Sequence, residues 1–112
     1  MNIINLTPHD VTVLNTDGSI KCIYKSAVRN NTMELPRVVV TKRDIGYIND
    51  IPLSEVHISS VEHIPEYTQD TIYIVSKLVS SAIPYRGDLV SPDGLVKDSA
   101  GNICGCTGFC RG

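Results

Sequence analysis

The sequence predicts a small α+β domain that is rich in strands and contains one short helix. Short apolar runs of Ile, Val and Leu alternate with polar pairs typical of turns, such as Asp-Gly and Asn-Asp. The chain has no Trp and a single Phe, so β-branched and aliphatic side chains must form most of the core, which favours sheet. Only one segment, near residues 76–83, has a helical pattern.

The composition indicates a single domain over residues 1–112. Hydrophobic residues make up 42% and charged residues 20% of the chain, which is enough apolar surface to offset the entropy lost on folding. The net charge of -2 provides no basic surface for a long polyanion, so we expect no duplex nucleic acid partner. No apolar run approaches the roughly eighteen residues of a membrane span, and we expect a cytoplasmic protein with its four cysteines reduced.

The N-terminal third is predicted to form three strands and a long loop. Pro8 marks a corner between the first two strands, because proline fixes φ and lacks a backbone donor. The pair Asp17-Gly18 favours a hairpin turn, since such turns need positive φ. The predicted strands cover residues 3–6, 11–14 and 20–24, and the polar loop covers residues 25–33.

The middle of the chain is predicted to form a core strand followed by a hairpin. Residues 37–42 are rich in valine and are interpreted as a buried strand. Asn49-Asp50 lies between two further apolar runs, 45–48 and 51–53, and predicts the hairpin turn. Pro52 should keep its strand at a sheet edge, because it cannot donate a ladder hydrogen bond.

Residues 71–83 combine a strand and a two-turn helix. Thr71–Val75 is the strand, Ser76 is the predicted N-cap, and Pro84 ends the helix. The buried stripe is expected at Leu78, Val79, Ala82 and Ile83. The remainder, residues 88–109, is predicted to form a compact β-meander with turns at 92–94 and 99–102.

No recognisable catalytic or metal centre is present in the sequence, and no cofactor is expected. The cysteines at 104, 106 and 110 do not have the paired C-x-x-C spacing of zinc sites, so buried thiols and a loose C-terminal tail are the favoured interpretation. His57-Ile58-Ser59 is one copy of an element that two-histidine phosphoesterases use twice. Neither a P-loop nor a dinucleotide fingerprint occurs.

Three polar segments are candidates for ligand binding. Ser76 and Lys77 lie where free helix N–H groups could receive an anion, although Ser76 would also serve as a plain cap. Tyr85, Arg86 and Asp88 suit a nucleotide, because they offer stacking, phosphate binding and a hydroxyl acceptor. An Arg86–Asp88 pair within the turn is the alternative. Likewise, Thr7, His9 and Asp10 either line a pocket or satisfy the backbone of a tight corner.

Two segments resemble a family of small phage and prophage proteins. The first is Asn5-Leu6-Thr7-Pro8-His9 near the start, and the second begins with Ile72-Tyr73-Ile74-Val75-Ser76 and continues through Pro84, Arg86, Asp88-Leu89-Val90 and Gly105-Cys106. This resemblance implies a phage origin and, by analogy, an accessory protein that blunts host defence. It places the protein in the cytoplasm of the host bacterium.

These observations lead to three hypotheses about function. The first is a non-enzymatic sponge, an oligomer of this chain that sequesters a small nucleotide-derived immune signal such as a cyclic oligonucleotide or a cyclic ADP-ribose-type molecule. The second is an inhibitor that binds a host protein through an exposed strand edge, with Pro52 and residues 25–34 flanking the contact. The third is a phosphodiesterase that uses His57.

Overall fold

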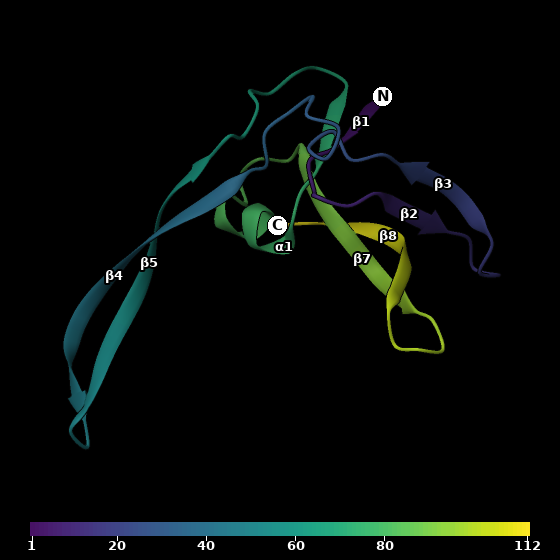
Figure 1. Ribbon diagram of the computed structural model, residues 1–112. Helices are drawn as coiled ribbons and strands as arrows, with labels where there is room; N and C mark the ends of the chain where they lie inside the picture. Colours follow the sequence, from purple (N-terminus) through teal and green to yellow (C-terminus); the bar gives the residue numbers. More distant parts are fainter.

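The computed structural model describes all 112 residues and contains eight strands and one helix (Figure 1), which confirms the predicted fold class. In chain order the elements are β1 (Asn2–Asn5), β2 (Val11–Leu14), β3 (Ile20–Tyr24), β4 (Arg37–Ile48), β5 (Ile51–Glu62), β6 (Thr71–Ile74), α1 (Lys77–Ala82), β7 (Leu89–Lys97) and β8 (Ile103–Arg111). The single helix has neither the length nor the apolar character of a membrane-spanning helix.

Six of the strands form one mixed sheet in the order β1-β6-β7-β8-β2-β3. The strand β6 is parallel to both of its neighbours, whereas β7–β8 and β2–β3 are antiparallel pairs. The sheet curls so that its two edges approach each other. The Ala27 N–H, just beyond β3, donates a hydrogen bond of 2.9 Å to the Asn5 carbonyl of β1.

Both faces of the curled sheet are apolar, as the period-2 alternation of β6 shows. Tyr73 and Val75 point to the helix side, where they pack with Leu6, Val79 and Leu89. The intervening Ile74 points to the other side. There it belongs to a second cluster with Val11, Val13, Val90 and Cys106.

The helix α1 begins and ends as the sequence predicts. The Ser76 hydroxyl accepts a hydrogen bond from the Val79 N–H at 3.3 Å, which satisfies one of the free donors of the first turn. The predicted buried stripe is wrong at Leu78, whose exposed fraction is 62%. With only six residues, α1 turns a narrow face to the sheet, and Val79 and Ser80 fill it.

The strands β4 and β5 form a long two-stranded hairpin, called the arm below, that projects from the rest of the molecule (Figure 1). The predicted turn is confirmed, with φ of 48° at Asn49 and 66° at Asp50. The expectation that residues 37–42 form a core strand is wrong. Each arm strand pairs only with the other, so apart from the base, where Val38 packs against the helix-side cluster, no second layer covers it.

The C-terminal segment is a single hairpin of β7 and β8 rather than a meander with two turns. The predicted turn at residues 99–102 lies in the connection between the two strands, but Pro92–Gly94 lies within β7. The strand β8 then lies beside β2, with Val13 opposite Cys106. The expected loose tail is therefore wrong, since β8 is an inner strand of the sheet.

Candidate functional site

The corner that follows β1 is organised by the buried amide of Asn5. Its Nδ2 donates to the carbonyls of His9 at 2.8 Å and Tyr24 at 2.9 Å. Its Oδ1 accepts from the Thr7 N–H at 2.9 Å and from the Thr7 hydroxyl at 2.7 Å. A fully bonded buried amide holds a backbone in one conformation, because breaking any of these bonds would leave a desolvated polar atom.

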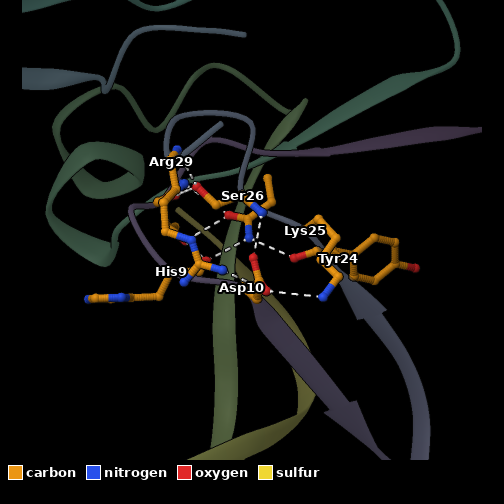
Figure 2. Close-up of polar contacts among 8 residues, drawn as sticks. His9, Asp10, Tyr24, Lys25, Ser26 and Arg29 are labelled. Carbon is orange, nitrogen blue, oxygen red and sulfur yellow. Dashed lines mark hydrogen bonds and ion pairs between the residues drawn. The ribbon is translucent and has the colours of Figure 1, made fainter. Parts of the chain in front are cut away.

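Asp10 connects this corner to the loop that follows β3. Its Oδ1 accepts from the Ser26 N–H at 2.8 Å, and its Oδ2 lies 3.4 Å from Lys25 Nζ and 3.2 Å from Arg29 Nη2 (Figure 2). The backbone hydrogen bond from Ser26, assisted by the two cations, lowers the pKa of Asp10 below its usual 3.8. The carboxylate is therefore charged at neutral pH.

Ser26 completes the connection between corner and loop. Its buried hydroxyl donates to the Thr7 carbonyl at 2.6 Å and accepts from the Arg29 N–H at 3.0 Å. Corner and loop are thereby held together although about twenty residues of chain separate them. We refer to Asn5, Thr7, Asp10, Ser26 and Arg29 as the corner network.

Three basic side chains lie at the surface of the corner network. The side chains of Lys25 and Arg29 are 76% and 62% exposed, and the imidazole of His9 points away from the network (Figure 2). Asp10 is the only carboxylate paired with Lys25 and Arg29. The local charge is therefore positive, and several N–H donors remain available to an anion.

An apolar cleft of about 320 Å³ lies beside the corner network, with His9 and Asp10 in its lining. Ligand pockets commonly measure about 300–1,000 Å³, so this cleft accepts one small ring system. Leu95 of β7 and Ile103 of β8 are both exposed and line it. The complete lining is His9, Asp10, Val11, Thr12, Pro92, Leu95, Ile103, Cys104, Gly105 and Cys106.

The predicted residues Ser76 and Lys77 lie near the corner but serve the fold. The Leu6 N–H donates to the Ile74 carbonyl at 2.8 Å, so β1 and β6 leave the sheet at the same end. The Ser76 hydroxyl caps the helix, as its alternative interpretation proposed. Lys77 Nζ reaches the C-terminal segment, 3.4 Å from the Gly112 carbonyl.

The predicted group Tyr85, Arg86 and Asp88 lies at the opposite end of β6. The Tyr73 N–H donates to the Asp88 carbonyl, which places this turn where β6 begins rather than where it ends. Arg86 donates to both Asp88 oxygens at 2.8 Å and to the Pro65 carbonyl at 2.9 Å. The hydrogen-bonded Arg86 lowers the pKa of the buried Asp88, and Tyr85 is the most exposed residue of the three.

The three predicted binding segments therefore do not form one site. The corner with Thr7 and His9 is next to the Ser76 junction, but the length of β6 separates both from Tyr85. Sequence reasoning assigned Lys25 and Arg29 only to a polar loop. No local signal could have paired them with Asp10, because they are 15 and 19 residues away.

The cysteines and His57 do not form a common metal or catalytic site. Cys106 is buried and burial raises the pKa of its thiol, whereas Cys104 is exposed at the cleft. No three His, Cys, Asp or Glu side chains are grouped so that they could hold a metal ion. His57 lies on the arm, where its Nε2 contacts Glu55 Oε1 at 2.7 Å.

Comparison of the chain with protein-family models, with curated proteins and with solved structures finds no match. The function is therefore inferred from the geometry of the corner and its cleft.

Proposed function

We propose that this protein is a non-enzymatic sponge that sequesters a small nucleotide-derived anion, such as a cyclic oligonucleotide or a cyclic ADP-ribose-type signal. The observation that carries this proposal is that the apolar cleft is lined by His9 and by Asp10, whose carboxylate contacts the exposed side chains of Lys25 and Arg29. A nucleotide offers the matching chemistry, since it joins a planar ring to a phosphate.

In the proposed complex the ring occupies the cleft and the phosphate faces the cations. Leu95 and Ile103 would cover the ring, and removal of their exposed surface from water would favour binding. Arg29 and His9 would donate to phosphate oxygens, while Asp10 holds Arg29 in place. The bonds within the corner network reduce the ordering cost of binding, because the corner is already fixed before the ligand arrives.

Isothermal titration with cyclic dinucleotides, cyclic trinucleotides and ADP-ribose derivatives tests the proposal. Arg29→Gln removes the guanidinium and should weaken binding about ten- to a hundredfold, the effect of losing one charge-assisted contact worth roughly 1.5–3 kcal/mol. Arg43→Gln is the matched control, since Arg43 is also an exposed arginine paired with one carboxylate, but it lies on the arm.

The proposal is wrong if no member of the panel binds, or if Arg29→Gln and Arg43→Gln bind equally well while both remain folded by circular dichroism. Chromatography of the released ligand tests the absence of turnover. A sponge returns the ligand intact, whereas a hydrolysed product would favour the phosphodiesterase hypothesis, which His57→Ala then examines.

A further inference from the structure

The arm has two chemically different faces. Residues directly opposite each other in an antiparallel pair share a face, and successive residues alternate. The register therefore assigns one face, called the apolar face, to five cross-strand pairs. These pairs are Val38 with Val61, Val40 with Ile58, Lys42 with Val56, Asp44 with Ser54, and Tyr47 with Pro52.

The apolar face is a continuation of the protein core. At the base of the arm Val38 and Val61 pack against the helix-side cluster. Further out Val40, Val56 and Ile58 are at least half exposed, and Tyr47 is 73% exposed. The same stripe that is partly buried at the base is thus uncovered along the rest of the arm.

The opposite face of the arm is polar over most of its length. It carries Thr41, Arg43, Glu55 and His57, with Glu55 contacting both Arg43 and His57. Toward the turn, at Ile45, Ile48 and Ile51, this face also bears large exposed apolar side chains. The difference between the faces is that of a ribbon with one side buried and the other in water.

An arm of this kind is unfavourable as an isolated ribbon. A two-stranded hairpin alone in water is marginally stable at best, and large continuous apolar patches on soluble proteins usually mark interaction sites. A standard interface uses roughly 20–30 residues from each partner. The five pairs of the apolar face supply ten residues, so a contact through this face alone belongs to the small class of specific interfaces.

The two charges on the apolar face favour a second copy of this chain as its partner. Lys42 and Asp44 are the only charged residues on this face, they have opposite signs, and both are exposed. In a two-fold interface residue i contacts residue j while j contacts i. An axis that passes between Lys42 and Asp44 therefore places each of them against the opposite charge of a second copy. The apolar pairs on either side of them would then face one another.

We propose that the apolar face of the arm binds the same face of a second copy of this chain, with the two arms antiparallel about a two-fold axis near residue 43. Lys42 of each copy pairs with Asp44 of the other, and Tyr47 packs against Val40 and Ile58. This surface is separate from the cleft of the proposed sponge, so either proposal can fail without the other.

Sedimentation equilibrium of the full chain over a range of concentrations tests this dimer. In the dimer of Lys42→Glu, the new glutamate of each copy would face Asp44 of the other. In the dimer of Asp44→Lys, the new lysine of each copy would face Lys42 of the other. Because like charges then oppose each other, each variant should associate at least about tenfold more weakly. An equimolar mixture of the two variants should recover association as a heterodimer. In that heterodimer the introduced glutamate of one chain faces the introduced lysine of the other, and the two unchanged residues, Asp44 and Lys42, also face each other. Native mass spectrometry distinguishes the heterodimer by mass.

Thr41→Glu is the control, since it adds a negative charge one residue away on the polar face and should leave association unchanged. The proposal is overturned if the unmodified chain is monomeric at high micromolar concentration. A chain that binds a host protein but does not associate with itself would also overturn it. It is also overturned if the single variants associate normally, or if mixing them restores nothing. Recovery in the mixture would show that both variants are folded.

Discussion

At the scale of single residues, the ion pair between Arg86 and Asp88 illustrates how a plausible ligand-binding arginine becomes part of the fold. Asp88 is only 4% exposed, and Arg86 bonds both of its carboxylate oxygens as well as the Pro65 carbonyl. The guanidinium thereby joins the segment before β6 to the segment before β7. The Nε and Nη2 donors of Arg86 are therefore occupied within the fold.

Arg86→Ala should destabilise the protein by about 3–5 kcal/mol at neutral pH, because it leaves a buried carboxylate without its cation. Urea unfolding measures the change. Arg43→Ala provides the control, since it breaks an exposed pair on the arm and should cost at most about 1 kcal/mol. Equal losses in the two variants would contradict the structural role given to Arg86.

The same pair determines how stability should depend on pH. Arg86 lowers the pKa of Asp88 in the folded state below its usual 3.8, so the folded state releases this proton more readily than the unfolded chain. The resulting stabilisation is complete above about pH 4 and is lost as pH falls through the folded pKa. The difference between wild type and Arg86→Ala should therefore shrink in acid, and a constant difference from pH 7 to pH 2 would refute this.

At the scale of elements, the packing of β8 against β2 depends on a residue without a side chain. A Cβ at Gly105 would lie 2.8 Å from Leu14 Cγ and 3.0 Å from the Thr12 carbonyl. Real Cβ atoms do not approach other atoms within 3.0 Å, so the Leu14 side chain of β2 would have to move, and the Thr12 carbonyl would remain in tight contact. The position requires glycine for close approach of two strands, not for backbone freedom.

Gly105→Ala should consequently destabilise the protein by about 1–3 kcal/mol, the usual cost of overpacking. Gly108→Ala in the same strand is the matched control, because a Cβ there meets nothing within 4 Å. Thermal unfolding of both variants measures the contrast. If Gly105→Ala is no less stable than Gly108→Ala, the close contact between β2 and β8 is not present in solution.

At the scale of the whole molecule, the protein consists of a curled sheet with a helix and an arm that extends from it. The radius of gyration is 17.1 Å, whereas a compact chain of this length would have about 13 Å. Both apolar clusters consist of residues from outside the arm apart from Val38 and Val61 at its base. The curled sheet and the helix should therefore fold without most of the arm.

Replacing residues 41–57 by Asn-Gly tests this expectation. Val40 and Ile58 are directly opposite each other, so a two-residue turn can join them. The shortened chain should unfold cooperatively, and small-angle scattering at high dilution should give a radius of gyration of about 13 Å. Asp50→Gly, which introduces the same Asn-Gly turn but keeps the whole arm, is the control and should keep the radius of gyration near 17.1 Å. Loss of cooperative unfolding in the shortened chain would show that the arm is needed for folding.

The sequence by itself determined the features that depend on neighbouring residues. Asp17-Gly18 and Asn49-Asp50 specify their turns because few residues adopt positive φ, and Ser76 and Pro84 bound the helix because a cap and a missing donor act within one turn. The strand-rich fold class followed from the composition for the same reason, since β-branched residues favour extended backbone wherever they occur.

Only the tertiary structure decided which surfaces these elements share. The valines of residues 37–42 are as apolar as a core strand, yet beyond Val38 they belong to an uncovered arm, because β4 pairs with β5 alone. Asp10 meets Lys25 and Arg29, and the cleft forms between β2, β7 and β8, because distant segments are adjacent in the sheet. Such contacts depend on strand order, which local preferences do not encode.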